Sequence, residues 1–244
     1  MDELRRSKGY VYLQETKLDR DRLRSMERPR IEPAPVYKDY PDSRKVSLPE
    51  PELAGKDLKR ALQNRRSRRR FSRSGLSLGE LSALLWASQG ITAVMAGHAL
   101  RTAPSAGALY PVETYLAVQQ VDGLDSGLYH FNPRRFELDL LEEGDFGALV
   151  GRACLGQRFM AQAGAVFCWS AVLRRNFCKY GHRGFRYVLM DAGHICQNLL
   201  LAAEALELSA CPVAAIFDEE LNELFQLDGH EESVIYCAAA GQSA

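Results

Sequence analysis

Residues 187–206, YVLMDAGHICQNLLLAAEAL, are almost entirely apolar and restrict the possible folds more than any other segment. A helix that is apolar on nearly all sides has to be buried among other elements. The segment therefore predicts a long helix at the centre of the fold. No uninterrupted apolar run approaches the ~18 residues that indicate a membrane-spanning helix, so we expect no membrane partner.

The segments around this helix mix strands and helices without a regular βαβ alternation. Ser77 is a predicted helix N-cap, Glu80 completes a capping box, and Gly90 lies at the end of the same helix. Apolar and alternating runs predict strands over residues 112–121, 128–131, 135–141, 165–173, 210–216 and 233–241, and a further helix over 218–227. Asn132-Pro133 separates the second and third of these strands and predicts that they form a hairpin. This order favours the α+β class, with a mostly antiparallel central sheet flanked by helices, over a doubly wound parallel sheet.

The N-terminal residues differ from the rest of the chain. Six prolines lie between positions 29 and 51, a density that stops helices and favours extended chain. We interpret residues 1–52 as an extended arm that wraps the body or a second subunit, and residues 53–244 as the globular domain. Leu53, Leu58 and Leu62 lie near helical spacing and predict a helix at the start of that domain.

The charges are balanced overall but unevenly distributed. The net charge is zero, which argues against a protein that binds polyanions with its whole surface. Residues 1–73 hold 21 Lys and Arg against 12 Asp and Glu, and residues 74–244 hold 10 against 19. We expect the basic part to lie against the acidic body.

The cysteines and the first residues bear on where the protein works. None of the six cysteines forms a CxxC pair, and several lie in apolar runs, which indicates reduced and mostly buried thiols. The start, MDELRRSKGY, lacks the apolar region of a secretory signal. We therefore expect a cytoplasmic protein.

The segment RRSRRRF, residues 65–71, carries five arginines. Arginine binds phosphate oxygens bidentately, and a nearby hydroxyl adds a donor. In extended chain Arg65, Ser67 and Arg69 point to one side and can converge on one phosphate. A solvated basic turn and a nucleic-acid patch are the alternatives. The patch would need basic residues elsewhere, whereas the rest of the chain is net negative, so we expect no nucleic-acid partner.

The loop Pro104-Ser105-Ala106-Gly107 precedes the predicted strand 112–121. Its small residues let the backbone approach a flat ligand closely, and backbone N–H and C=O groups can then contact the edge of a ring. A role for Ser105 as a nucleophile is not supported, because the GxSxG motif is absent. The loop therefore predicts a binding function.

These two motifs, with three others in the same order, resemble the flavin-dependent nitroreductase superfamily and, more narrowly, the SagB-type (thiazole/oxazole oxidase-like) dehydrogenases. The further matches are KYGHRGFRYVLMDAGHICQNLLLAAEAL, IFDEELNELFQLDG and IYCAAAG. Together the motifs cover residues 53–244. The resemblance implies a nitroreductase-like fold that works as an intertwined homodimer with FMN at the subunit interface.

The resemblance also assigns roles to residues. It implies that the FMN phosphate and ribityl chain contact Arg65, Arg66, Ser67 and Arg69. It implies that the isoalloxazine ring contacts Pro104, Ser105, Ala106 and Gly107 of the other subunit. Ala214 and Ala215 match the place where a backbone N–H faces flavin N5, although the family often has glycine there. Many relatives add a basic residue after the last strand; here the sequence reads GQSA, so that contact is missing or comes from Arg66 or Arg70.

The resemblance places the catalytic pair at Lys179 and Tyr180. In heterocycle-forming members, a Lys-Tyr pair at the matching place removes a proton while FMN takes a hydride. A lysine at its usual pKa of ~10.4 is a poor base, so the site would have to lower that pKa, and Arg183 and Arg186 are candidates for doing so. The alternative is a solvated lysine beside an aromatic lid.

The sequence therefore predicts an FMN-dependent oxidoreductase that transfers a hydride between flavin N5 and an azoline-bearing peptide or a small electron-poor molecule. NAD(P)H is the candidate reductant. The alternatives are a non-redox flavin-binding or flavin-fragmenting protein of the same fold, and a nucleic-acid-binding module. Cys178, His182, His194 and Cys196 match no familiar zinc spacing, so no metal is assigned, and Asp191 is the expected partner of His194.

Overall fold

The computed structural model describes residues 3–25, 29–53, 57–95 and 97–244. Its centre is a seven-stranded sheet in which every neighbouring pair is antiparallel. In spatial order the strands are β1 (Lys45–Ser47), β8 (Glu137–Glu143), β7 (Gly127–Asn132), β5 (Val112–Val118), β9 (Ala165–Val172), β11 (Glu232–Gly241) and β10 (Ser209–Val213). The predicted α+β class and the hairpin at Asn132-Pro133 are thus confirmed.

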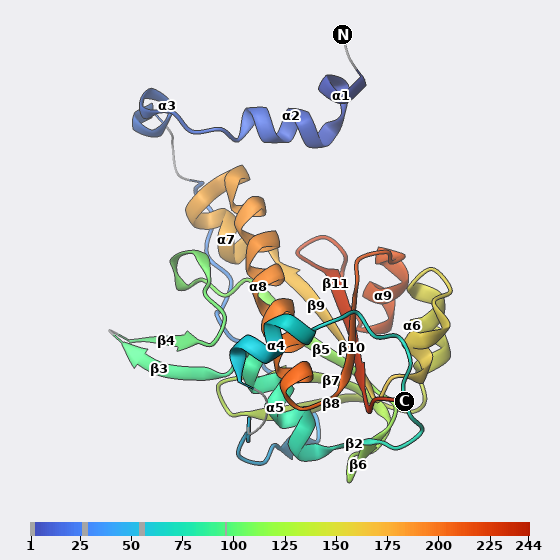
Figure 1. Cartoon of the computed structure of the whole chain (residues 1–244). Helices are drawn as coiled ribbons and strands as arrows, with labels where there is room; N and C mark the ends of the chain where they lie inside the picture. The colour runs from blue at the N-terminus through green and yellow to red at the C-terminus, as the bar shows by residue number, and fades with distance from the viewer. Residues whose placement is uncertain (1–2, 26–28, 54–56, 96) are drawn as a thin grey trace.

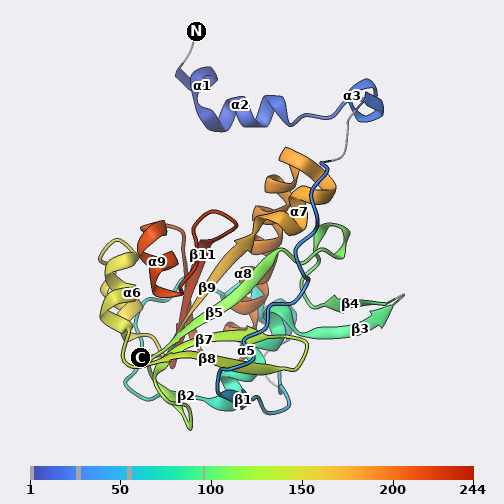
Figure 2. The ribbon, with the colours of Figure 1, turned by 180° about the vertical axis from the view of Figure 1, so that it is seen from behind.

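Helices cover both faces of the sheet (Figures 1 and 2). Because side chains alternate along a strand, Val112 and Leu116 of β5 face one layer and Tyr115 faces the other. The first layer contains α5 (Leu78–Gln89) and α8 (Gly184–Ala205), and the second contains α6 (Gly147–Ala153) and α9 (Asp218–Leu224). No helix of the described residues is long and apolar enough to cross a membrane.

The long apolar helix predicted over residues 187–206 is α8, and its second half is buried as expected. Its first half is not buried on all sides. Leu189 is 62% exposed and Met190 is 57% exposed, and Phe185 lies beside them one turn earlier. The expectation of a fully enclosed helix is therefore wrong for the single chain, in which an apolar stripe of α8 remains uncovered.

The N-terminal arm is only partly extended. Residues 3–25 contain the helices α1 (Glu3–Arg6), α2 (Lys8–Glu15) and α3 (Arg20–Ser25), contrary to the expectation for residues 1–52. The reason is that the helix-stopping prolines begin only at position 29. From there to residue 53 the chain is extended apart from turns, and Figure 2 shows this blue segment crossing one face of the sheet to β1.

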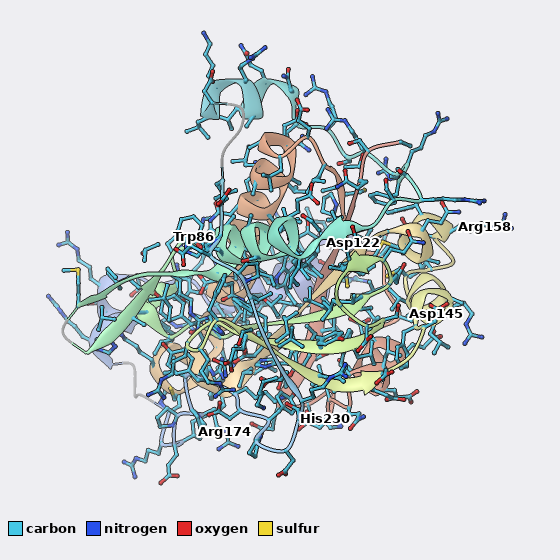
Figure 3. All side chains as sticks on the ribbon, turned by 90° about the horizontal axis from the view of Figure 1, so that it is seen from below. Trp86, Asp122, Asp145, Arg158, Arg174 and His230 are labelled. Carbon is cyan, nitrogen blue, oxygen red and sulfur yellow. The ribbon has the colours of Figure 1, made fainter. Side chains whose placement is uncertain are left out.

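Ion pairs join the basic N-terminal part to the acidic body, as the charge distribution predicts. Lys38 Nζ lies 2.6 Å from Glu232, Arg44 lies 2.7 Å from Asp125, and Lys45 Nζ lies 2.7 Å from Asp139. Other charges, such as Arg158 and Asp145, lie at the rim of the molecule in Figure 3.

The remaining elements are short. They are α4 (Leu58–Asn64), β2 (Leu76–Ser77), β3 (Ile91–Met95), β4 (His98–Arg101), β6 (Val121–Asp122), α7 (Leu173–Tyr180) and the 3-10 turns η1 (Ala106–Ala108), η2 (Arg158–Gln162) and η3 (Gly181–Arg183). The predicted strand 112–121 divides into β5 and β6. The predicted helix around Leu53, Leu58 and Leu62 corresponds to α4, whose N-cap is Asp57, and residues 54–56 of that prediction lie outside the described part of the chain.

The capping box of α5 is present as predicted. Ser77 Oγ accepts a hydrogen bond from Glu80 N at 3.1 Å, and the Glu80 carboxylate accepts one from Ser77 N at 2.7 Å. Ser77→Ala should lower the free energy of unfolding by about 1 kcal/mol, because it leaves a helix N–H without its partner. Urea unfolding measures this change. Ser47→Ala, at an exposed site of β1, is the control and should change the stability by less than half as much.

A row of buried charges lies between the sheet and the arm. His130 Nε2 is 3.0 Å from Glu113 and His130 Nδ1 is 3.2 Å from Asp139, while Arg175 lies 2.6 Å from Glu113. Burial alone would lower the pKa of His130, but the hydrogen bonds to Asp139 and Glu113 raise it above 6.5. Burial would raise the pKa of Glu113, but Arg175 and His130 hold it at about 2.

These shifts predict a pH dependence of stability. The raised pKa of His130 contributes stability that is complete below about 6.5 and is lost as the pH rises through the folded-state value. The lowered pKa of Glu113 contributes stability that is present above 4.5 and is lost as the pH falls towards about 2. We expect the greatest contribution between pH 4.5 and 6.5. NMR titration of the histidine rings, with exposed His98 and His230 as internal references, should give His130 a midpoint above 6.5. A midpoint below 6.5 would contradict the paired imidazolium.

Candidate active site

The arginine segment leaves the helix α4 without forming regular secondary structure of its own. Helix α4 ends at Arg65, which is its C-cap, and residues 65–70 have no helical or strand assignment. Arg68 N donates to Ala210 O at 3.0 Å and Ser72 N donates to Gln242 O at 2.9 Å. The segment therefore lies along β10 and the residues that follow β11.

The side chains of this segment alternate between two sides. Arg68 forms an ion pair with the buried carboxylate of Glu204. On the other side, Ser67 and Arg69 lie close enough to the Cys211 thiol to oppose the rise in its pKa that burial causes. Burial raises the pKa of the Cys196 thiol to about 12, and the nearby charge of Arg65 opposes that rise. Arg65, Ser67 and Arg69 therefore lie around two neighbouring thiols, those of Cys196 and Cys211.

Arg66 behaves differently from these three residues. Its guanidinium donates to its own segment, to Gln63 O at 3.0 Å and to Arg65 O at 2.8 Å. Among the described residues, no ion pair joins Arg65, Arg66 or Arg69 to a carboxylate. Arg65 and Arg69 therefore carry cationic groups whose charge no described carboxylate neutralises.

The loop at Pro104–Gly107 is held against α8. Ser105 Oγ donates to Asp191 Oδ2 at 2.6 Å and accepts from Tyr110 N at 2.9 Å. Ala106 N lies 3.4 Å from Asp191 Oδ1. Burial raises the pKa of Asp191, against the effect of the Ser105 hydrogen bond. Ser105 therefore positions the loop through an acid that the sequence assigned to His194. A carboxylate inside the otherwise apolar stretch 187–206, such as Asp191, needs a polar partner, and this is the sequence signal for its contact with the loop.

Lys179 and Tyr180 lie at the end of α7, directly against this loop. Gly107 has a φ of 66°, which favours glycine, and a Cβ built on it would lie 2.5 Å from Tyr180 Oη and 2.6 Å from Lys179 Nζ. The Lys179 ammonium also lies 5.4 Å from the centre of the Tyr180 ring. The structure therefore brings Lys179, Tyr180 and Gly107 together.

Arg183 and Arg186, the cations considered for Lys179, bind the arm. Arg183 donates to Thr16 O at 2.6 Å, and Arg186 donates to Thr16 Oγ1 at 2.8 Å. Both guanidinium groups thus serve to fix the end of α2.

Ala214 and Ala215 follow β10 and are exposed. Among the described residues, neither backbone N–H has a hydrogen-bond acceptor. Both N–H groups are therefore available to a ligand, and the alanine Cβ atoms lie on an open part of the surface.

The single chain gathers the predicted residues into two groups. The Pro104–Gly107 loop contacts α8 at Asp191, whereas the arginine segment approaches α8 at Cys196 and Glu204. With 3.6 residues per turn, residues 191 and 196 point about 140° apart around the helix. The two groups therefore lie on different sides of α8.

The comparisons with known proteins agree with this fold. The model of the nitroreductase family matches residues 62–242. The chain therefore belongs to the nitroreductase family, whose members are oxidoreductases. The chain is 37% identical over 186 residues to MJ1384 of Methanocaldococcus jannaschii, which is also named a nitroreductase. This alignment covers 76% of this chain and 91% of MJ1384. The chain also resembles trifolitoxin operon protein TfxC of Rhizobium leguminosarum bv. trifolii, with 29% identity over 207 residues, 79% of this chain and 57% of TfxC.

Solved structures show the same likeness. A protein of Anabaena variabilis that is named a nitroreductase aligns with a TM-score of 0.78 and 28% identity. The alignment covers 96% of this chain and 47% of the Anabaena chain. One from Ralstonia eutropha aligns with a TM-score of 0.71 and 26% identity over 89% of this chain and 98% of its own. The chain spans about half the length of the Anabaena protein and of TfxC.

Proposed function

We propose that the protein is an FMN-dependent oxidoreductase. The observation that carries this proposal is that two guanidinium groups and a hydroxyl, those of Arg65, Arg69 and Ser67, lie around the neighbouring thiols of Cys196 and Cys211. This donor set suits a phosphate monoester, which is the anionic end of FMN. A family structure from Desulfovibrio desulfuricans, with a TM-score of 0.55 and 19% identity, contains FMN.

The flat part of the cofactor also has a matching surface. The Pro104–Gly107 loop has no large side chain, and Gly107 lies against the ends of the Lys179 and Tyr180 side chains. The free N–H groups of Ala214 and Ala215 supply donors for the edge of a ring. The residues present therefore fit FMN at both its phosphate and its isoalloxazine ring.

The proposal includes a homodimer that completes the site. The two groups of site residues lie on different sides of α8 in one chain, so a second copy has to bring its loop to the arginine segment of the first. The uncovered stripe of Phe185, Leu189 and Met190 on α8 supplies an apolar contact surface for that copy. Leu58 and Leu62 of α4, also exposed, add to it.

FMN, when bound, supplies hydride transfer at its N5 atom. Arg65 and Arg69 hold the phosphate and fix the register of the cofactor. Tyr180 Oη and Lys179 Nζ, both next to Gly107, exchange a proton with the substrate that lies over the ring. The ammonium next to the phenol compensates negative charge that develops on the tyrosine oxygen.

The names of several relatives support a substrate class. TfxB is named a trifolitoxin-processing protein and TfxC a trifolitoxin operon protein. McbC of Escherichia coli, 26% identical over 137 residues, is named a microcin B17-processing protein. We infer a SagB-type activity: dehydrogenation of an azoline ring in a peptide, or reduction of a small electron-poor molecule with NAD(P)H. This chain covers 38% of TfxB and 50% of McbC.

The visible absorption spectrum of the purified protein tests the cofactor. Flavin bands, with FMN as the released chromophore on chromatography, would support the proposal. A colourless protein that also fails to take up added FMN would contradict it. Flavin that no nicotinamide nucleotide, dithionite or substrate can reduce would instead favour a non-redox role.

A further inference from the structure

A cavity of about 750 Å³ lies between the N-terminal arm and the end of α7. Figure 1 shows α2 above the ends of α7 and α8. The arm is fixed there by Tyr12 Oη, which donates to His182 O at 3.0 Å, and by Arg183, which donates to Thr16 O at 2.6 Å. Thr16 is only 7% exposed. The arm is thus one wall of a built cavity, whose volume is in the range of small-molecule sites.

Four residues with aromatic rings line the cavity, namely Tyr12, Phe177, Tyr180 and His182. Phe177 is fixed by edge contacts with His182 and Phe185. Tyr180 lines the cavity, and its hydroxyl lies next to Gly107 of the Pro104–Gly107 loop. The cavity therefore opens beside the candidate catalytic group, and its rings offer surfaces on which a flat molecule can stack.

The charges that line the cavity are mostly positive. Among the described lining residues, Lys17, Arg22, Arg30 and Arg183 are cationic and Glu15 is the single carboxylate. Arg183 donates to a carbonyl and to the Tyr187 hydroxyl, both neutral, so these hydrogen bonds leave its charge uncompensated. Arg30 has no ion pair with a described carboxylate. A ligand with a negative charge gains most from this lining.

We propose that the arm and the end of α7 form the substrate pocket, and that the pocket binds a flat ring carrying an anionic group. This inference rests on the proposed function, because it places the ring next to Tyr180. Two sources share this chemistry: an aromatic or heteroaromatic carboxylate that is the substrate, and a nicotinamide nucleotide that is the reductant. The rings orient the flat part, and the cations of the arm bind the anionic part.

Isothermal titration calorimetry on the full-length protein tests the pocket without turnover. The probes are 4-nitrobenzoate, the neutral 4-nitrobenzamide of the same shape, and NADPH. Arg30→Glu should weaken 4-nitrobenzoate binding about tenfold, because it replaces attraction by repulsion, and should change 4-nitrobenzamide binding by less than about twofold. Lys17→Glu is a second variant at the same rim. Arg6→Glu, on α1 and outside the cavity, is the matched control and should change neither.

The outcomes separate the two sources and the two proposals. If Arg30→Glu loses binding of 4-nitrobenzoate alone, the pocket is the site of the anionic substrate. If Arg30→Glu loses binding of NADPH, the pocket is the site of the reductant. Equal binding of 4-nitrobenzoate and 4-nitrobenzamide, or equal effects of Arg30→Glu and Arg6→Glu, would overturn the inference. The proposed function would still stand if the protein contains flavin. A protein without flavin would contradict the proposed function, yet the calorimetric comparison would still decide whether the cavity selects anions.

Discussion

Replacing Arg65 and Arg69 together by alanine should weaken FMN binding by about 10²–10⁴-fold. Each guanidinium donates hydrogen bonds to a charged phosphate in the proposed site, and such bonds contribute about 1.5–3 kcal/mol each. Riboflavin lacks the phosphate but has the same ring, so its affinity should change by less than about threefold. Quenching of flavin fluorescence on titration of the apoprotein measures both affinities.

The control for this experiment is Arg73→Ala, which removes an exposed arginine just beyond the segment. It should leave both affinities unchanged. Equal losses for FMN and riboflavin would mean that the double variant has damaged the loop or the fold. Unchanged FMN affinity would show that the phosphate binds elsewhere, and the basic segment would then have to be considered as a surface for a larger anion.

Much of the fold could be predicted because its signals are local. The N-cap at Ser77, the turn at Asn132-Pro133 and the apolar run of β9 are each encoded within a few neighbouring residues. The helices of residues 3–25 differ from the predicted extended arm because the helix-stopping prolines begin only at position 29 and do not act on the residues before them. The exposed stripe on α8 could not be predicted, because a sequence pattern shows that residues are apolar but not which of them the same chain covers.

The candidate site divides in the same way. The proposed alternation of Arg65, Ser67 and Arg69 needs only locally extended backbone, and residues 65–70 form neither helix nor strand. The contact between Gly107 and the pair at positions 179 and 180 depends on how α7 and α8 pack, so spacing alone could not reveal it. Likewise, the hydrogen bond from Ser105 to Asp191 joins residues 86 positions apart and required the fold.

Tyr180→Phe should lower the rate of substrate turnover by about 10²–10⁴-fold while the protein retains its flavin. The substitution removes the hydroxyl next to Gly107 but keeps the ring that lines the cavity, so proton transfer is lost and stacking remains. Lys179→Ala should have a comparable effect on turnover. Stopped-flow kinetics with the dithionite-reduced protein and 4-nitrobenzoate measure the rate, and the visible spectrum measures flavin content.

Tyr187→Phe is the matched control, because the Tyr187 ring packs edge-on against Tyr180 at 4.9 Å and its hydroxyl accepts from Arg183, away from Gly107. It should reduce the rate by less than about threefold. If Tyr180→Phe and Tyr187→Phe behave alike, the Tyr180 hydroxyl has no part in proton transfer and the pair at 179 and 180 only shapes the pocket. If Tyr180→Phe alone slows the reaction, and the solvent isotope effect on its residual rate rises, then proton transfer has become rate-limiting in the variant. The Tyr180 hydroxyl therefore takes part in that transfer in the unchanged protein, since the ring, the flavin and the cavity are the same.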